Sequence, residues 1–193
     1  MAEIRTIAVI GAGFSGRNIA QLSALGGFRT ILEDILPASL RKAESEIRDA
    51  LDRSVAKGII TRMAASAAFG QIEYATSIEQ AARAADLIIE AVPVELESKL
   101  EIFILLDKVA RPATILASST DMFSVTELAS VTYRAQKIPG MLFSVSADGT
   151  GLLEIVRGQQ TDDATAAACL EVGRRMGRKT VVIAEAVRSA AQQ

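Results

Sequence analysis

A glycine-rich segment directly after an apolar run constrains the fold of this chain more than any other feature. The run Ile7–Ile10 is followed at once by the pattern Gly-x-Gly-x-x-Gly, made up of Gly11, Ala12, Gly13, Phe14, Ser15 and Gly16. In a strand–turn–helix unit the first glycine makes the tight turn, the second lets the backbone approach a pyrophosphate, and the third lets the helix pack closely on the sheet. The segment therefore predicts a dinucleotide-binding βαβ unit, with these six residues beside the cofactor.

The acidic pair Glu33 and Asp34 bears on which dinucleotide would bind. Asp34 lies eighteen residues beyond Gly16, where the second strand of such a unit ends. A carboxylate at this point accepts hydrogen bonds from the adenine ribose hydroxyls and repels a 2′-phosphate. Glu33 is expected to add negative charge beside it. The sequence therefore favours NAD over NADP, and an acid at this distance argues against the alternative that the glycines form a purely structural turn.

Composition and charge exclude several classes of protein. The 193 residues carry 21 basic and 23 acidic side chains, interspersed along the chain with a net charge of −2, so we expect no nucleic-acid partner. No apolar run approaches the ~18 residues of a membrane span. The N-terminus, with Glu3, is not typical of a signal peptide. We therefore expect a cytoplasmic protein without a membrane partner.

The absence of histidine limits the chemistry that the chain can perform. Histidine is the commonest general base near neutral pH and the commonest ligand of transition metals, and this sequence has none. Cysteine occurs once, as Cys169, in a helical stretch where it is expected to be a small core residue. We therefore expect no metal site and no disulfide.

Short apolar runs alternate with longer amphipathic stretches, which is typical of a parallel sheet flanked by helices. The longest amphipathic stretch, Pro37 to Lys57, has a proline in its first turn and apolar residues at helical spacing. Ser77 and Asp162 are predicted helix N-caps. We predict one α/β domain over residues 1–193, a Rossmann-type, doubly wound, mostly parallel sheet with flanking helices. Its eight strands are expected at residues 5–10, 29–34, 71–75, 86–92, 113–118, 137–143, 152–157 and 179–184.

From residue 4 to about residue 184, the chain resembles the NAD-binding domain of the 3-hydroxyacyl-CoA dehydrogenase family. The resemblance rests on the glycine segment with Ile19-Ala20-Gln21, on Leu87–Val92 with the stretch from Leu96 to Phe103, on Ile115–Ser118, and on Leu153–Val156. The spacing between these segments needs no insertion or deletion. Family members reversibly oxidise the C3 hydroxyl of a 3-hydroxyacyl-CoA with NAD. The resemblance therefore implies an NAD-dependent oxidoreductase of fatty acid metabolism.

The resemblance also implies positions for cofactor and substrate. Lys99 matches a lysine on the nicotinamide side of the cofactor, and Val94 stands where the family has the glutamate that accompanies it. Lys57 matches a lysine that contacts CoA phosphates, or equally is a surface lysine at a helix C-terminus, where a cation is favourable. Further cofactor contacts are expected at Ala91, Val92 and Ser119.

The residues that carry out the chemistry in the family are mostly replaced here. Leu142 stands at the position of its catalytic histidine, Asp121 at that of its serine and Ser119 at that of its asparagine. Glu154 matches the glutamate that orients the histidine. Loss of a general base typically costs about 10²–10⁴ in rate. Glu154 and Asp121 remain the candidate catalytic residues, although Glu154 alone is also interpreted as a strand-end acid that is solvated or paired with Arg157.

The sequence leaves three functions open. The first is an NAD(H)-binding domain that has lost most of its dehydrogenase chemistry. The second is an active oxidoreductase on a 3-hydroxyacyl-CoA or another hydroxy acid, completed by a partner chain or by self-association. The third is an interaction role, in which Val145, Leu152 and neighbouring apolar residues form a patch on the face that the family's C-terminal helical domain covers. The segment Glu185–Ser189 lacks the proline and glycine that join the two domains in the family, so we expect a stand-alone domain.

Overall fold

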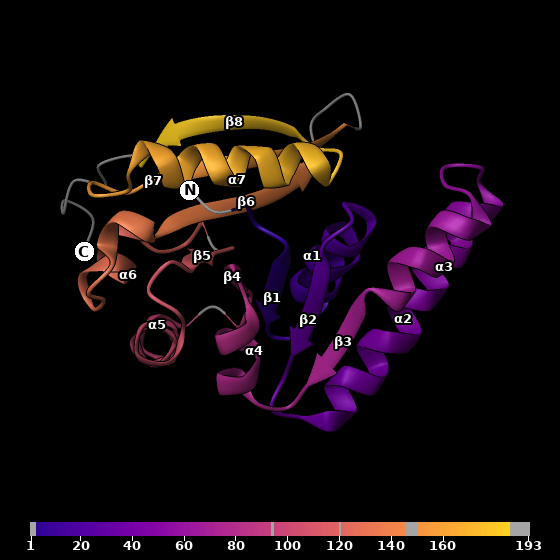
Figure 1. Cartoon of the computed structure of the whole chain (residues 1–193), viewed down its shortest axis with the longest axis horizontal. Coiled ribbons are helices and arrows are strands. Elements are labelled where there is room, and N and C mark those ends of the chain that lie inside the picture. The colour runs from indigo at the N-terminus through magenta and orange to yellow at the C-terminus, as the bar shows by residue number, and fades with distance from the viewer. Residues whose placement is uncertain (1–2, 94, 120, 146–149, 186–193) are drawn as a thin grey trace.

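The computed structural model describes residues 3–93, 95–119, 121–145 and 150–185. In this part of the chain eight strands form one sheet in the order β3-β2-β1-β4-β5-β6-β7-β8 (Figure 1). All neighbouring strands are parallel except β6 and β7. This arrangement confirms the predicted Rossmann-type, mostly parallel sheet. The strands are β1 (Thr6–Ile10), β2 (Arg29–Glu33), β3 (Ile72–Ala75), β4 (Leu87–Glu90), β5 (Ile115–Ser118), β6 (Pro139–Val145), β7 (Gly151–Arg157) and β8 (Lys179–Ala184).

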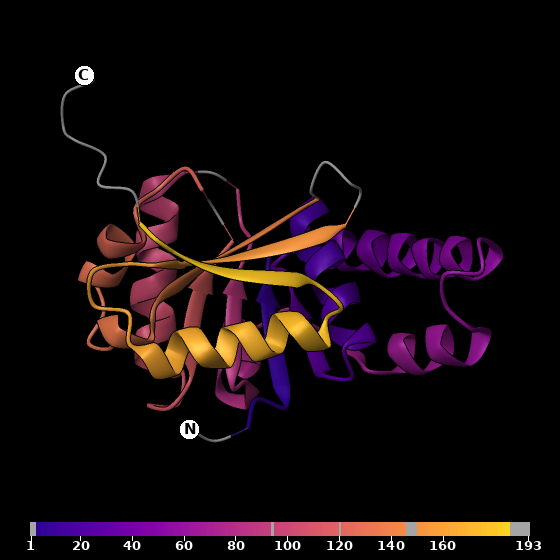
Figure 2. The same ribbon diagram turned by 90° about the horizontal axis from the view of Figure 1, so that it is seen from above.

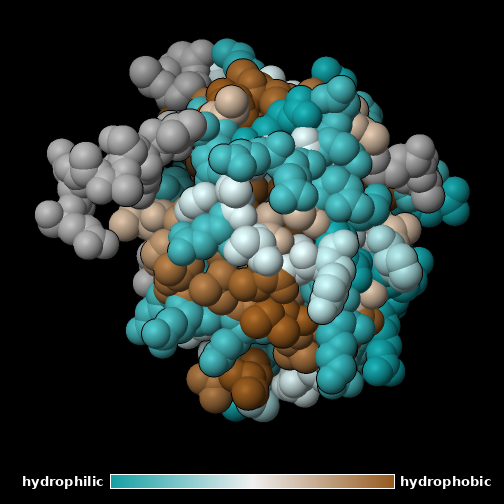
Figure 3. Space-filling model, turned by 90° about the vertical axis from the view of Figure 1, so that its left-hand side faces the viewer, coloured by the Kyte–Doolittle hydropathy of each residue, from teal (hydrophilic) through white to brown (hydrophobic). Residues whose placement is uncertain are grey.

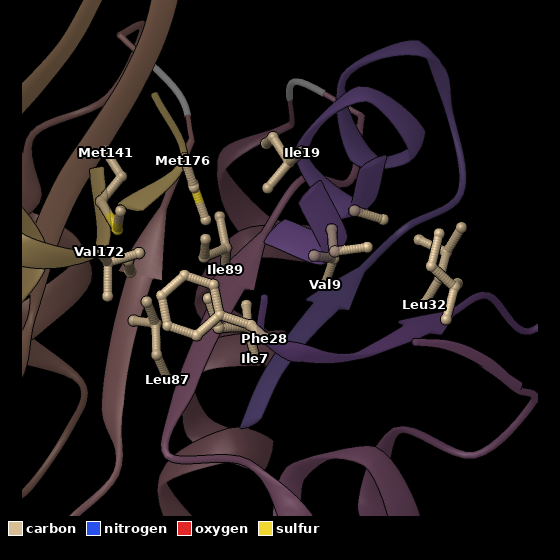
Figure 4. Close-up of a cluster of buried hydrophobic side chains, with 14 of the residues drawn as sticks. Ile7, Val9, Ile19, Phe28, Leu32, Leu87, Ile89, Met141, Val172 and Met176 are labelled. Carbon is tan, nitrogen blue, oxygen red and sulfur yellow. The ribbon is translucent and has the colours of Figure 1, made fainter. Parts of the chain in front are cut away.

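The central strands are apolar because helices cover both of their faces. Every residue of β1 and β4 is buried, and successive residues of each strand enter opposite layers of the core. One layer packs against α1 (Phe14–Leu25), α2 (Pro37–Ala56), α3 (Arg62–Gly70) and α7 (Asp163–Arg175). Figure 4 shows its centre, where Phe28 lies beside the strand residues Ile7 and Leu87 and Met176 lies near Ile89. The other layer packs against α4 (Ile78–Ala84), α5 (Leu96–Val109) and α6 (Val125–Ser130).

Local sequence signals set most of the helix ends. The hydroxyl of Ser77 accepts a hydrogen bond from the Gln80 N–H at 3.3 Å, and a carboxylate oxygen of Asp162 accepts one from the Thr165 N–H at 2.6 Å. Both predicted N-caps are thereby confirmed. The long predicted helix from Pro37 ends at Ala56, one residue early. It forms an arm with α3 that extends away from the sheet (Figure 2).

The order of the strands places a crevice at one end of the sheet. The chain proceeds from β1 outward through β2 to β3 and then returns to β4 on the other side of β1. In doubly wound sheets, ligands bind outside the carboxyl ends of the strands at such a switch point. The glycine segment follows β1 directly, and Ala91 follows β4, so the predicted cofactor residues lie at this point. In the described residues, no helix is long and apolar enough to cross a membrane.

Candidate cofactor-binding site

The three glycines of the segment have three different environments. Gly11 has a φ of 100°, and a Cβ there would lie 2.9 Å from the Ala91 carbonyl oxygen. A Cβ on Gly16 would lie only 1.7 Å from the Gly11 carbonyl oxygen, so this glycine allows α1 to pack against the loop. A Cβ on Gly13 would meet no protein atom within 4 Å. The space beside Gly13 is therefore open to a ligand, as the dinucleotide hypothesis requires.

The N-terminus of α1 presents backbone donors to the same space. Gly13 is the N-cap, with an extended backbone and no side-chain cap. The first N–H groups of a helix have no partner within the helix, and together with the helix dipole they attract an anion. Phe14 and Ser15 are exposed in this first turn. An uncapped helix end with open space before it fits the pyrophosphate of a dinucleotide.

Asp34 is held against the glycine loop by two backbone hydrogen bonds. Its Oδ2 accepts from the Ala12 N–H and its Oδ1 from the Leu36 N–H, both at 2.9 Å. Each carboxylate oxygen keeps a further lone pair, because an ionised carboxylate offers about four acceptor sites. Asp34 is therefore fixed beside the loop and retains acceptors for ribose hydroxyls, in agreement with its predicted role.

Glu33 differs from the expectation that it adds charge to the site. Its side chain is only 5% exposed, and burial, followed by the nearby charge of Asp34, raises its pKa to about 7. The reason is that helices cover both faces of β2, whose last four residues, Thr30 to Glu33, are all buried, while Asp34 follows the strand end. Near neutral pH, Asp34 therefore carries the discrimination against a 2′-phosphate without a full second charge from Glu33.

Replacing Glu33 by glutamine should remove a pH-dependent loss of stability. Because the folded-state pKa is raised from 4.5 to about 7, the folded chain keeps a proton that the unfolded chain releases, and stability falls as the pH rises through this range. At about 1.4 kcal/mol per pKa unit, urea unfolding at about pH 8 should show E33Q more stable by on the order of 2–3 kcal/mol. At about pH 4 the two proteins should match.

Glu73 provides the matched control for this prediction. It lies on the adjacent strand β3, where the hydrogen bond from Arg29 lowers its pKa. E73Q should therefore not gain stability at high pH. Parallel stability–pH curves for the wild type and E33Q would contradict the prediction.

A buried ion pair lies directly under the site. The Lys99 Nζ is 2.6 Å from the Glu90 Oε1, and the two side chains are 1% and 0% exposed. Glu90 also accepts hydrogen bonds from the Val92 N–H at 2.7 Å and the Ser118 hydroxyl at 2.7 Å. The ammonium of Lys99 donates to the Val92 carbonyl at 3.2 Å. These bonds tie together the carboxyl ends of β4 and β5 and the loop after β4.

This ion pair changes the interpretation of Lys99. The resemblance implied a lysine reaching the nicotinamide side with its acidic partner lost at position 94, which lies outside the described residues. Lys99 instead has a buried partner in Glu90, which the sequence analysis did not single out as a site residue. The available signal was an acid at the end of an otherwise apolar central strand. Lys99 thus fixes the loop from beneath, through contacts to Glu90 and Val92.

The other predicted cofactor contacts lie around the same crevice. The Ala91 N–H donates to the Ile10 carbonyl at 2.8 Å, and the Ser119 N–H donates to the Glu90 carbonyl at 2.9 Å. Ala91, Val92 and Ser119 are each half-buried at the strand ends. Asp121 follows β5 in an exposed bend. The structure therefore groups the glycine segment, Asp34 and these strand-end residues at the carboxyl ends of the parallel strands.

The antiparallel pair β6–β7 carries the remaining candidate catalytic residue. Glu154 is half-buried and lies opposite Leu142 in the ladder. In the described residues, Glu154 forms no ion pair. Arg157 pairs instead with Asp163 at 2.7 Å, so the predicted pairing of Glu154 with Arg157 is wrong. The reason is that residues three apart on a strand point to opposite faces.

Two other predicted features are not brought to the site. Val145 pairs with Gly151 and Leu152 with Ser144, so Val145 and Leu152 point to opposite faces of the hairpin and do not form one patch. Lys57 is exposed and follows the last residue of α2. The 20 residues of this helix span about 30 Å, so Lys57 lies far from the helix start beside Asp34.

Comparison with known proteins agrees with this geometry. Residues 6–186 match the family model described as the NAD-binding domain of 3-hydroxyacyl-CoA dehydrogenase. The chain belongs to the 3-hydroxyacyl-CoA dehydrogenase family. This match confirms the resemblance found in the sequence and assigns residues 6–186 to an NAD-binding domain. The chain therefore includes the NAD-binding domain of an oxidoreductase family.

Individual relatives show how much of the family's architecture this chain includes. It is 34% identical over 181 residues to a probable 3-hydroxybutyryl-CoA dehydrogenase of Bacillus subtilis, covering 94% of this chain and 63% of the relative. The crystal structure of (S)-3-hydroxybutyryl-CoA dehydrogenase from Ralstonia eutropha superimposes with a TM-score of 0.90 at 32% identity, covering 95% of this chain and 65% of that one. The chain thus spans about three fifths of the length of these relatives.

Glu185 lies where the sequence analysis placed the start of the family's interdomain junction. Its carboxylate accepts hydrogen bonds from the N–H groups of Val125 and Thr126 and from the Thr126 hydroxyl. Glu185 therefore caps the N-terminus of α6. The other four residues of the predicted junction, 186–189, lie outside the described residues.

Proposed function

We propose that this chain binds NAD(H) and has little or no 3-hydroxyacyl-CoA dehydrogenase activity. The observation that carries the proposal is the ladder position opposite Glu154, which Leu142 occupies. By resemblance this is the position of the histidine that takes the hydroxyl proton. NAD, when bound, accepts or supplies the hydride. Leucine neither accepts a proton nor donates a hydrogen bond, so the proton has no base beside Glu154 on β6.

The substrate side of the proposal is an acyl-CoA. A groove between α1 and α2 opens beside the glycine segment. It is lined by Phe14, Arg17 and Arg53, among others, together with the acidic Glu46 and Asp49, and Glu46 pairs with Arg17 at 2.8 Å. Arg53 and Lys57 are four residues apart and share one side of α2. These guanidinium and ammonium groups are the donors that phosphates require, and Phe14, 72% exposed, offers a ring for stacking. They support CoA binding along α2.

An NADH fluorescence titration together with NADH consumption in the presence of acetoacetyl-CoA tests the proposal. We expect saturable NADH binding and turnover at background level. Leu142→His restores an imidazole opposite Glu154, and we expect it to raise turnover, with Leu142→Asn as the matched polar control that supplies no base. Wild-type turnover above background, at a rate equal to or above that of L142H, would contradict the loss of chemistry. Absence of NADH binding would contradict the proposal altogether.

The second candidate function is an active oxidoreductase that uses a water held by Glu154. The half-buried Glu154 carboxylate, without an ion-pair partner among the described residues, favours it. In this case a partner chain or a second copy would cover the cleft, and Asp121 and Ser119 would contact the substrate. Glu154→Gln should then abolish a measurable wild-type turnover while leaving the NADH affinity unchanged. Equal turnover in both proteins would argue against this candidate.

A further inference from the structure

Helix α5 displays one exposed line of residues with an ordered pattern. Glu97, Glu101, Ile104 and Lys108 recur every three or four residues, so they follow one line along the helix surface. All four are exposed, and Ile104 keeps 51% of its surface in solvent. Acidic residues therefore precede the isoleucine, and a basic residue follows it.

The surroundings of this line are more apolar than a solvent-facing helix requires. Eight of the 14 residues of α5 are apolar, and six of these belong to or pack against the core: Leu96, Leu100, Ile102, Phe103, Leu106 and Val109. Ile104 and Leu105 lie outside that core cluster, so apolar side chains extend beyond the inner side of the helix. Figure 3 looks onto this side of the molecule and shows an apolar band across it. Polar residues border the band, as they do in many association surfaces.

An exposed aromatic side chain lies beside the same helix. The Tyr133 N–H donates to the Asp107 carboxylate of α5 at 2.9 Å, which fixes the backbone of Tyr133 next to the helix. Its side chain is fully exposed. Tyrosine is enriched in protein interfaces because it combines a large apolar ring with a hydrogen-bonding group.

The charge pattern of α5 indicates that a second copy of this chain binds to this surface. If two copies of α5 pack antiparallel about a two-fold axis near Ile104, Glu101 of each copy faces Lys108 of the other, and the two isoleucines meet at the axis. A two-fold interface requires a surface that is complementary to itself, and this line meets that condition. In the described residues, neither Glu101 nor Lys108 forms an ion pair. The helix dipole alone would favour the same charge order, but it would not favour an exposed Ile104 between the charges.

We propose that the chain forms a reversible homodimer through antiparallel pairing of α5. The expected affinity is modest. A single helix pair buries less than the roughly 1,200–2,000 Å² of a stable interface, so the dissociation constant should be micromolar or weaker. The NAD-binding crevice lies at the carboxyl ends of the strands and stays accessible in such a dimer. The proposal is thus independent of the proposed function.

Sedimentation equilibrium of charge-exchange variants tests this arrangement. The wild type should shift with concentration from the 20.4 kDa monomer towards twice that mass. Glu101→Lys and Lys108→Glu each create two like-charge contacts per dimer, so each should weaken association by about tenfold or more. The double variant exchanges the charges and should return to within about threefold of the wild type. A monomer at all concentrations, or single variants that associate like the wild type, would overturn the proposal.

Cross-linking at the two-fold axis provides a second test. Under a mild oxidant, Ile104→Cys should give a disulfide-linked dimer, because the axis places the two thiols together. Cys169 is buried and does not compete. Ile59→Cys, at a position 69% exposed after α2, is the matched control and should remain monomeric under the same conditions. Equal cross-linking of both variants, or none at position 104, would overturn the antiparallel arrangement.

Discussion

Gly13→Ala is expected to abolish NADH binding while leaving the fold intact. A Cβ at this position meets no protein atom within 4 Å, and the φ of −67° suits any residue, so the substitution causes no clash; because alanine is a poorer N-cap than glycine, we expect a loss of at most about 1 kcal/mol. The added methyl group would instead occupy the space that the pyrophosphate needs next to the backbone. We expect the NADH affinity to fall at least about 100-fold, which corresponds to roughly 3 kcal/mol. Fluorescence titration measures the affinity and urea unfolding measures the stability.

The two neighbouring controls separate the role of the ligand space from that of packing. In Gly16→Ala the new Cβ would lie 1.7 Å from the Gly11 carbonyl oxygen, which is a backbone atom that cannot rotate away. We expect this variant to lose at least about 1–3 kcal/mol of stability and to bind poorly for that reason. Gly70→Ala, at the end of α3 with no neighbour within 4 Å, should keep both properties. Wild-type NADH affinity in G13A would contradict a pyrophosphate at this loop.

The elements that the sequence predicted well depend on residues that are close together in the chain. Apolar runs between turn residues located all eight strands within a few residues, and the caps at Ser77 and Asp162 were correct because a cap is a contact with the next helical turn. The glycine segment was also predictable, since its three glycines act within one turn. The proposed contact of this segment with the pyrophosphate of NAD rests on the same local geometry.

Some of the features that the sequence did not predict involve residues that are far apart in the chain. Others depend on which residues lie opposite each other in two paired strands. Lys99 meets a carboxylate on β4 and, through it, Ser118 on β5, and no spacing along the chain indicates that choice of partner. Other errors were avoidable. Alternation along one strand excludes the pair of Glu154 with Arg157. Glu33 ends an apolar strand that is buried on both faces, so its burial was also predictable. The separation of Val145 from Leu152 required the register of the hairpin, which only the structure supplies.

Lys99→Met should cause the largest loss of stability of any single side-chain truncation near the site. The substitution leaves the Glu90 carboxylate fully buried without its cation, although the Val92 N–H and Ser118 hydroxyl still donate to it. Breaking a buried ion pair on one side typically costs about 3–5 kcal/mol, a large share of the roughly 5–15 kcal/mol that stabilises a domain. Urea unfolding measures the loss. Lys42→Met on α2, an exposed lysine, should change the stability by less than about 0.5 kcal/mol.

A double variant shows whether the unpaired charge is the cause. In E90Q/K99M no buried charge remains, and the glutamine still offers an oxygen to the Val92 N–H, so we expect part of the lost stability to return. If the double variant were as unstable as K99M, lost packing of the lysine stem, and not the charge, would explain the effect. Because the same bonds hold the Val92 backbone at the crevice, a stable double variant should also recover NADH affinity.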